Sequence, residues 1–210
     1  MKIALIGATG NIGSAIAQEA LRRKHAVTGI TRRTSGLPPT LTGIEVRSAD
    51  VLDQAALTAA VEGHDVLASA FGPGADAALI VDATRAIVAA ARAVGIKRVI
   101  VVGGAGSLEI GGGKQLVDSP NFPAAYRSYA LAHREALAVL RDAADLNWTF
   151  FAPAAEIGPG DKVGKFRVSV RSLIADEAGR SAISYADYAA AFVSEIEAGS
   201  HPKEVVTVAY

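Results

Sequence analysis

The chain has 210 residues, half of them apolar, and its 21 acidic and 21 basic side chains give a formal net charge of zero. This length and composition predict one large domain with a sizeable core, and the lack of a basic excess argues against a general binder of nucleic acid or anionic membranes. Cysteine is absent, which excludes disulfides and thiolate metal sites, and the four histidines, at positions 25, 64, 133 and 201, form no close ligand pair.

Short β-branched runs alternate with longer alanine-rich stretches of helical periodicity along the whole chain. Expected strands cover residues 3–6, 26–30, 44–48, 65–69, 98–102, 148–151 and 205–208, and expected helices cover 11–23, 54–61, 76–94, 125–144 and 185–198. Strands such as VIVV are apolar throughout, as in a parallel sheet that is covered on both faces. The alternation with helices indicates βαβ crossovers. The sequence therefore predicts a single α/β domain with a doubly wound parallel sheet.

Local signals mark some of the boundaries between these elements. Asp53 stands where an N-cap would begin the second helix, and Gly95 stands where a left-handed residue would end the third. Residues 103–123 and 152–170 do not fit simple βαβ units, and both follow expected strands. Ligands of doubly wound sheets bind beyond the carboxyl ends of the strands, so we expect these two segments to be functional loops.

The first expected strand runs directly into GATGNIG, residues 7–13. The pyrophosphate of a dinucleotide binds the free N–H groups and the dipole of a helix N-terminus when the backbone comes close. We expect Gly7 to make the tight turn, Gly10 to leave room for the phosphates, and Gly13 to let the helix pack on the strand. The spacing differs from the standard G-x-G-x-x-G fingerprint, and the alternative is a plain βα turn that binds nothing. We also expect Thr9, Asn11 and Ile12 of this turn to contact the dinucleotide.

The second expected strand ends in Thr31, Arg32 and Arg33, where proteins that prefer NAD carry an acid that binds the adenosine ribose. A guanidinium forms charge-assisted hydrogen bonds to a 2′-phosphate, whereas an acid would repel it. The sequence therefore favours NADP(H) over NAD(H). The alternative is that one or both arginines are solvated surface residues.

Several stretches of the sequence, taken together, resemble a known family. The stretches GATGNIG, SADVLD (48–53), 101–123, 150–170 and 182–210 together resemble the NmrA-like, NAD(P)H-binding group of atypical short-chain dehydrogenases. Members of that group are often labelled NADH-flavin reductases, and the group is similar to the biliverdin-IXβ/flavin reductases. The resemblance implies a Rossmann fold in which residues 152–184 and 199–210 contribute a small C-terminal substrate lobe.

The resemblance also implies cofactor contacts from the segments that follow the expected strands. They are Asp50 and Val51 at the adenine, Ala70, Phe71 and Gly72 along the adenosine ribose and pyrophosphate, Gly103, Gly104 and Ala105 at the nicotinamide ribose, and Pro153 and Ala154 near the carboxamide. Each contact is physically reasonable because each segment ends a parallel strand on the ligand side. For Asp50, the alternative is that its carboxylate caps the loop.

The catalytic pattern departs from that of ordinary short-chain dehydrogenases, which use Ser, Tyr and Lys. Here Tyr129 has His133 where the lysine would stand, and the serine after the fifth strand is displaced to Ser107. A carbonyl that becomes an alkoxide needs a proton donor, whereas a flavin ring delocalises the incoming charge and the protein mainly orients the two rings. All three residues are candidates for substrate contact, with packing as the alternative for Tyr129 and His133 and a turn cap for Ser107.

Aromatic and basic side chains gather around the irregular segments. Phe122 and Phe166 lie within them and are candidates for contact with a planar ring, whereas Trp148 and Phe151 lie in an expected core strand and are better explained by packing. Lysines that border the same segments either attract an anionic substrate such as FMN or are solvated. These lysines are Lys114, Lys162 and Lys165.

We therefore expect an NADPH-dependent reductase that transfers hydride to a flavin (FMN, FAD or riboflavin) or to a similar planar conjugated acceptor. The alternative from a different class is a regulator that binds NADP(H) and senses redox state without turnover. A third interpretation is a carbonyl reductase that uses Tyr129 and His133.

We expect the protein to bind a small planar molecule and to bind neither nucleic acid nor a membrane. The sequence leaves open whether the protein forms a homodimer. No apolar stretch reaches the roughly 20 residues of a membrane span. Lys2 and the glycine-interrupted run after it do not form a signal peptide. We therefore expect a cytoplasmic protein.

Overall fold

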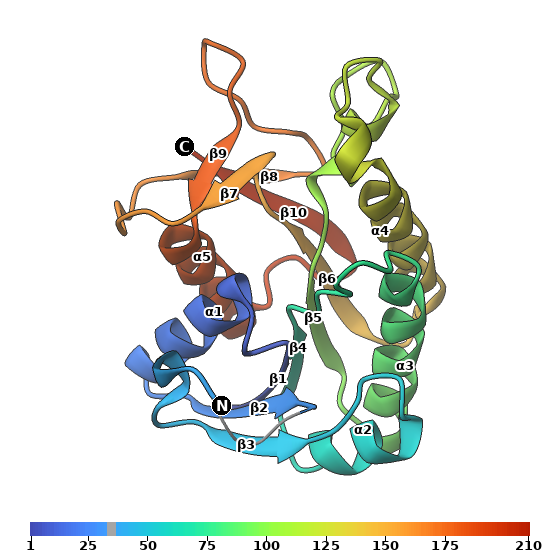
Figure 1. Ribbon diagram of the computed structural model, residues 1–210, viewed down its shortest axis with the longest axis vertical. Helices are drawn as coiled ribbons and strands as arrows, with labels where there is room; N and C mark the ends of the chain where they lie inside the picture. The colour runs from blue at the N-terminus through green and yellow to red at the C-terminus, as the bar shows by residue number, and fades with distance from the viewer. Residues whose placement is uncertain (33–36) are drawn as a thin grey trace.

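Figure 1 shows the computed structural model, which describes residues 1–32 and 37–210. The strands are β1 (Lys2–Ile6), β2 (Ala26–Thr31), β3 (Glu45–Ser48), β4 (Val66–Ser69), β5 (Arg98–Val102), β6 (Asn147–Ala152), β7 (Glu156–Gly158), β8 (Arg167–Val170), β9 (Ala182–Ser184) and β10 (Glu204–Ala209). The helices are α1 (Asn11–Arg22), α2 (Gln54–Val61), α3 (Leu79–Val94), α4 (Ala124–Asp142) and α5 (Tyr185–Ala198), with short 3₁₀ turns η1 (Pro39–Leu41), η2 (Ala105–Ser107) and η3 (Leu116–Asp118).

Across the described residues, an eight-stranded sheet has the order β3-β2-β1-β4-β5-β6-β10-β8. Its neighbouring strands are parallel except for β10 and β8, which run antiparallel. The chain winds outward from β1 through β2 and β3, then returns to the centre and winds the other way through β4, β5 and β6. This order confirms the predicted doubly wound Rossmann fold.

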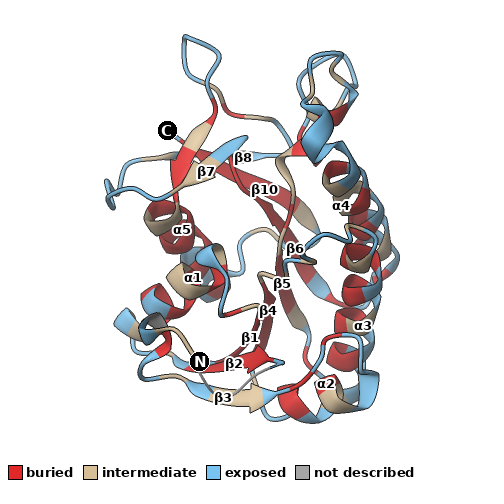
Figure 2. Cartoon of the chain, in the orientation of Figure 1, coloured by how far each residue is buried: buried red, intermediate tan, exposed pale blue. Residues whose placement is uncertain are grey.

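Helices cover both faces of the sheet: α1 and α5 lie on one face, and α2, α3 and α4 lie on the other (Figure 1). Successive side chains of β1 point to opposite faces, so Ile3 and Leu5 join the core beneath α1 and α5, whereas Ala4 and Ile6 join the other core. Figure 2 shows the buried residues concentrated in the strands and on the sheet-facing sides of the helices. Of the helices in the described residues, none is long and apolar enough to cross a membrane.

The boundary signals at the second and third helices are confirmed. The Asp53 carboxylate accepts hydrogen bonds from the N–H groups of Ala55 and Ala56, at 3.1 and 3.0 Å. Gly95 ends α3 with a φ of +77°, in the left-handed region that favours glycine. The expected start of α3 at residue 76 is wrong, because Asp76 instead accepts a hydrogen bond from Ala78 N in a turn that precedes the helix.

The second half of the chain contains strands that the sequence did not predict. Within residues 152–170, which were expected to be irregular, lie β7 and the antiparallel edge strand β8. The strands β7 and β9 pair in parallel, apart from the main sheet (Figure 1). The pair β7–β9 lies beside α5 and β10 (Figure 1).

A buried acid at the start of α5 ties this region together. Asp187 has no exposed surface, and its carboxylate accepts hydrogen bonds from Val163 N at 2.9 Å, Gly164 N at 2.8 Å and the Tyr210 hydroxyl at 2.8 Å. Its own N–H donates to Ser184 Oγ, which is the N-cap of α5. One side chain therefore fixes the loop after β7, the start of α5 and the end of β10 relative to one another.

Candidate functional site

The turn between β1 and α1 brings the backbone of the two elements unusually close. Gly7 has a φ of +76°, and a Cβ on it would lie 2.3 Å from the Ala70 carbonyl oxygen. A Cβ on Gly13 would lie 2.1 Å from the Gly7 carbonyl oxygen. Gly10, the N-cap of α1, would meet a protein atom only at 3.5 Å, so its side of the turn is open. The turn thus exposes the N–H groups of the first turn of α1, which have no partner within the helix.

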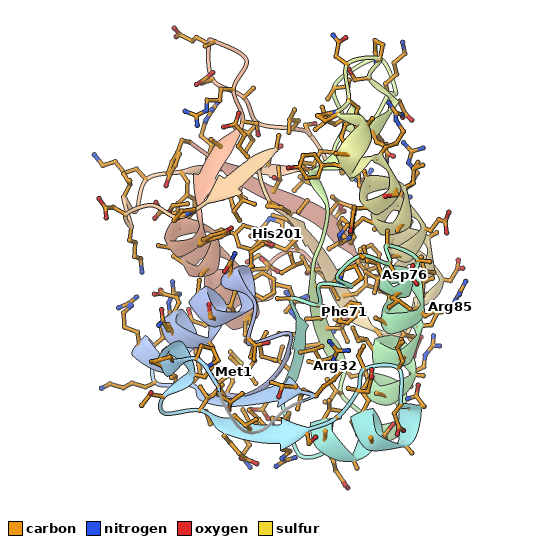
Figure 3. All side chains as sticks on the ribbon, viewed as in Figure 1. Met1, Arg32, Phe71, Asp76, Arg85 and His201 are labelled. Atoms are coloured by element: carbon orange, nitrogen blue, oxygen red, sulfur yellow. The ribbon has the colours of Figure 1, made fainter. Side chains whose placement is uncertain are left out.

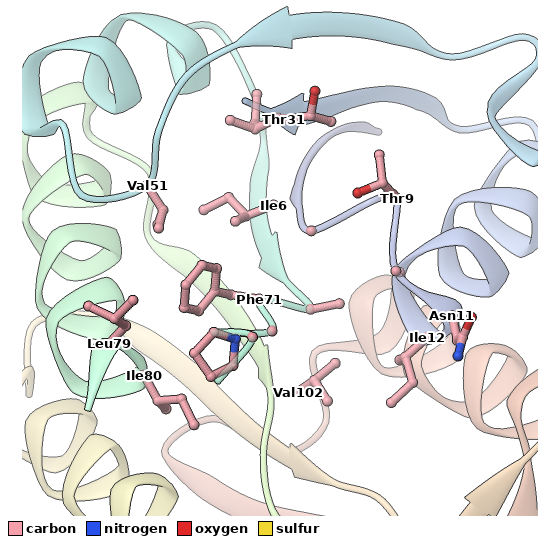
Figure 4. Close-up of a pocket in the computed structure, with 18 of the residues that line it drawn as sticks. Ile6, Thr9, Asn11, Ile12, Thr31, Val51, Phe71, Leu79, Ile80 and Val102 are labelled. Carbon is pink, nitrogen blue, oxygen red and sulfur yellow. The ribbon is translucent and has the colours of Figure 1, made fainter. Parts of the chain in front are cut away.

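The turn opens into a cavity of about 600 Å³ at the carboxyl ends of the parallel strands. This volume is in the range of small-molecule and cofactor sites. Figure 4 shows Thr9, Asn11 and Ile12 on one side of it and Leu79 and Ile80 on the other. The predicted site residues that line it are Gly7, Thr9, Gly10, Asn11, Ile12, Gly13, Thr31, Arg32, Asp50, Val51, Ala70, Phe71, Gly72, Gly103, Tyr129, His133 and Pro153.

Arg32 and Asp50 lie at the end of the cavity formed by the residues after β2 and β3. Arg32 is exposed and lines the cavity, as Phe71 does; Figure 3 labels both residues. Asp50 Oδ1 accepts a hydrogen bond from Leu52 N at 3.0 Å, so the carboxylate does cap its own loop. The same residue also lines the cavity, so capping and ligand contact are compatible. Arg33 lies outside the described residues.

At the other end, Tyr129 of α4 reaches across to the loop after β4. Its hydroxyl donates a hydrogen bond to the Gly74 carbonyl oxygen at 2.7 Å. The ring therefore lines the cavity while the hydroxyl proton is already engaged by the backbone. This link holds the loop after β4 against α4 beside the cavity.

His133 lies one turn further along α4 and is packed against the sheet. Its ring meets Phe150 edge-to-face with centroids 6.2 Å apart, and a Cβ on Gly104 would lie 2.9 Å from it. Burial lowers the pKa of His133 from 6.5 to about 4, so the imidazole is neutral at pH 7. A neutral imidazole is a weak proton donor, so His133 is better described as a lining residue of the cavity than as an acid.

Other predicted site residues lie behind the cavity wall rather than on it. Ser107 is 3% exposed, and its hydroxyl has no hydrogen-bond partner within residues 1–32 and 37–210. Gly104 faces the His133 ring, and Ala154 is buried in the core beneath α1 and α5. The predicted residues that do not line the cavity are Gly104, Ala105, Ser107 and Ala154.

The aromatic and basic candidates of the irregular segments also lie outside the cavity lining. Trp148 and Phe151 are core residues, as the packing interpretation predicted. Phe122 stacks beneath the Arg127 guanidinium at 5.7 Å, and Phe166 packs on the core beneath α1 and α5. Among the lysines, Lys114 and Lys165 are exposed, whereas Lys162 pairs with Glu19 at 2.9 Å.

Comparison with known proteins places this site in a family. The sequence model of the family described as NAD(P)H-binding matches residues 7–198, which begin directly after β1 and include the glycine turn and the other strands that supply the cavity. The chain belongs to this NAD(P)H-binding family. The match agrees with the resemblance that the sequence motifs carried.

Solved structures of similar proteins cover the whole chain. A protein from Burkholderia pseudomallei, provisionally named an exported protein, is 50% identical, with 100% of both chains covered and a TM-score of 0.94. A Bacteroides thetaiotaomicron protein, provisionally named an epimerase, is 36% identical over 100% of this chain and 96% of its own, with a TM-score of 0.92. A Streptococcus pneumoniae protein, provisionally named an NADH-flavin reductase, is 34% identical over 100% of this chain and 99% of its own, with a TM-score of 0.87.

The residues of the turn and the cavity fit the dinucleotide that the NAD(P)H-binding family binds. The close approach at Gly7 and Gly13 leaves the start of α1 bare, and the open side of Gly10 offers space for phosphate oxygens. The cavity then extends from Arg32 past the turn to Pro153, along the carboxyl ends of the strands. The chain is thus an NAD(P)H-binding protein with an oxidoreductase-like fold.

Several lining residues were not predicted from the sequence. Pro73 and Gly74 follow β4 on the ligand side, so the rule that selected Gly72 would have found them if it had been extended. Leu79 and Ile80, from the first turn of α3, and Tyr185, from the first turn of α5, carry no signal of their own. They reach the cavity because these two helices begin beside it.

Proposed function

We propose that the protein is an NADPH-dependent reductase that transfers hydride to a flavin or to a similar planar conjugated acceptor. When bound, the dinucleotide supplies the hydride from its reduced nicotinamide ring. The chain's contribution is to hold the pyrophosphate at the start of α1, to pair Arg32 with the 2′-phosphate, and to orient the acceptor ring at the Pro153 end of the cavity.

The observation that carries the proposal is the hydrogen bond from the Tyr129 hydroxyl to the Gly74 carbonyl. A carbonyl reductase needs a proton donor at the oxygen that becomes an alkoxide. Here the tyrosine proton is already donated to the backbone, and burial keeps His133 uncharged at neutral pH. A flavin makes a smaller demand, because its ring system spreads the charge of the hydride and solvent completes the protonation.

The acceptor ring would lie against an apolar and aromatic surface. Tyr185, Pro153, Val102 and Ile80 all line the cavity, with Ile80 on its α3 side (Figure 4). Flat apolar walls favour a planar ring, because stacking buries its two faces without requiring matched hydrogen bonds. The relative from Streptococcus pneumoniae, provisionally named an NADH-flavin reductase, supports the same substrate class.

The test is a turnover assay with purified protein, NADPH and either FMN, FAD or riboflavin, followed at the absorbance band of the reduced cofactor. We expect oxidation of NADPH that depends on both the protein and the flavin. A protein that binds NADPH but oxidises it with none of these flavins and with no quinone is not a reductase of this class.

A second candidate function is a regulator that binds NADP(H) and senses its redox state without turnover. The engaged Tyr129 hydroxyl supports this function as well, because a sensor needs no proton donor. Calorimetric titration separates the two functions: a sensor binds the oxidised and reduced cofactors with different affinities and shows no turnover, whereas a reductase consumes the reduced cofactor when a flavin is added.

A further inference from the structure

A second cavity, of about 550 Å³, adjoins the cofactor cavity. It runs along α1, where Ser14 and Gln18 line it, and Pro159, Gly160 and Lys162 of the loop after β7 form its opposite wall. Asn11 and Tyr185 line both cavities, so the two cavities adjoin at these residues. An acceptor whose ring lies against Tyr185 can therefore extend a tail into the second cavity, which we call the α1 groove.

A buried carboxylate with several cationic partners lies on the wall of the α1 groove. Glu19 is 7% exposed and accepts from Arg22 Nη2 at 2.8 Å, Arg23 Nε at 2.8 Å and Lys162 Nζ at 2.9 Å. The hydrogen bond from Arg22, with those from Lys162 and Arg23, holds the pKa of Glu19 well below its ordinary value despite burial. Glu19 is therefore ionised at neutral pH.

The charges of this cluster do not cancel. Arg23 also pairs with Glu197 at 2.6 Å, which leaves Arg22 and Lys162 opposite the single charge of Glu19. Their side chains are 63% and 39% exposed, and both line the groove. Each cation has N–H donors beyond those that Glu19 uses. The rim of the groove therefore carries surplus positive charge and free donors, which is the chemistry that binds a phosphate monoester or a carboxylate.

The loop that carries the lysine is held in place before any ligand binds. Asp187 accepts hydrogen bonds from Val163 N and Gly164 N, on one side of the lysine. Ser184 Oγ donates to the Asp161 carbonyl oxygen at 3.1 Å, on the other side. The Asp161 side chain is exposed and does not line the groove. A preorganised cation binds an anion at a smaller entropic cost than a mobile one.

We propose that the α1 groove binds the anionic tail of the acceptor, and that Arg22 and Lys162 select acceptors that carry a phosphate or carboxylate on a flexible chain. This inference rests on the proposed reductase function and specifies its substrate class. It predicts that FMN, with its phosphate, is a better substrate than riboflavin, which has the same ring and no charge.

The first experiment compares FMN with riboflavin in the wild-type protein and in the Arg22→Gln/Lys162→Gln double variant. We expect the double variant to raise KM for FMN about tenfold, to leave KM for riboflavin within twofold, and to leave kcat unchanged. The matched control is Arg85→Gln/Arg141→Gln, which removes exposed positive charges from α3 and α4, on the opposite face of the sheet from α1 (Figure 1). Glu19 keeps Arg23 as a partner in the double variant, so the buried carboxylate stays paired.

The second experiment requires neither turnover nor a variant. Quenching of flavin fluorescence reports FMN and riboflavin binding to the NADP⁺-saturated wild-type protein. Inorganic phosphate should weaken FMN binding but not riboflavin binding, relative to chloride at the same ionic strength. Equal KM values for the two flavins, unchanged by the double variant, overturn the groove inference and leave the reductase standing. If neither flavin is reduced, the reductase proposal fails, and phosphate-insensitive FMN binding then overturns the groove inference as well.

Discussion

At the scale of single residues, the preference for NADPH over NADH that we propose depends on Arg32. Replacing it with serine removes a guanidinium that we propose contacts the 2′-phosphate, so we expect Kd for NADPH to rise about three- to tenfold, with Kd for NADH little changed. Titration of both cofactors with the Arg32→Ser variant measures this difference. Arg141→Ser, on the exposed side of α4, is the control. Equal weakening of both cofactors would remove the argument for NADPH.

The Tyr129 hydroxyl gives a second prediction at this scale. Tyr129→Phe removes the hydrogen bond to Gly74 and leaves the ring in place. We expect kcat for flavin reduction to fall less than about threefold, because in the reductase that we propose no proton passes through this hydroxyl. General acid catalysis contributes typically about 10²–10⁴-fold, so a loss of that size would instead support the carbonyl reductase interpretation.

The pKa of His133 can be measured directly. In the unfolded chain the imidazole titrates near 6.5, whereas in the folded protein burial lowers its pKa to about 4. Between these values the unfolded state binds the proton and the folded state does not, so His133 lowers the stability of the fold as the pH falls from 6.5 toward 4. An NMR titration of the imidazole should have its midpoint near pH 4. A midpoint near 6.5 would show an exposed histidine and restore it as a candidate acid.

At the scale of elements, the contact of α1 with β1 depends on the glycine turn. A Cβ on Gly13 would lie 2.1 Å from the Gly7 carbonyl oxygen, so Gly13→Ala must push α1 away from the strand. We expect Kd for NADPH to rise at least tenfold, because the N–H groups at the start of α1 no longer reach the phosphates. Gly158→Ala in β7 is the matched control, because nothing lies within 4 Å of its Cβ position. Cofactor titration of both variants should separate them.

Asp187 holds three elements together: the loop after β7, the start of α5 and the end of β10. Asp187→Asn places an amide nitrogen where the N–H groups of Val163 and Gly164 donate, so at least one of them loses its acceptor. We expect the free energy of unfolding to fall by about 2 kcal/mol, measured by urea denaturation. Asp82→Asn, at an exposed i,i+3 pair of α3, should change it by less than about 0.5 kcal/mol. A similar small effect in Asp187→Asn would mean that the loop does not depend on this carboxylate.

At the scale of the whole molecule, the sequence predicted what local periodicity determines. The core strands and all of the α-helices follow from short apolar runs that alternate with longer stretches of helical periodicity, and from caps such as Asp53. The strands β7, β8 and β9 were missed because they are short and because β8 has exposed apolar residues, Val168 and Val170, rather than a buried run. Their pairing depends on segments far apart in the chain, which no local pattern records.

The same difference between local pattern and long-range packing explains which site residues the sequence predicted. The glycine turn was predictable because a single segment makes the strand, the turn and the helix. The partner of the Tyr129 hydroxyl, Gly74, comes from a distant loop, and Tyr185 joins the cavity only because α5 packs beside α1. Long-range packing also decided which residues after β5 reach the cavity, so Gly103 lines it and Ala105 does not.

The hydrogen bond from Tyr210 to Asp187 has a consequence for how the site is completed during synthesis. The glycine turn at residues 7–13 is synthesised before Tyr210, whose hydroxyl donates to the Asp187 carboxylate that holds the loop after β7. A nascent chain that still lacks β10 can therefore form the glycine turn before this loop is fully held in place. In the reductase that we propose, the wall for the acceptor is thus completed later than the turn for the coenzyme phosphates.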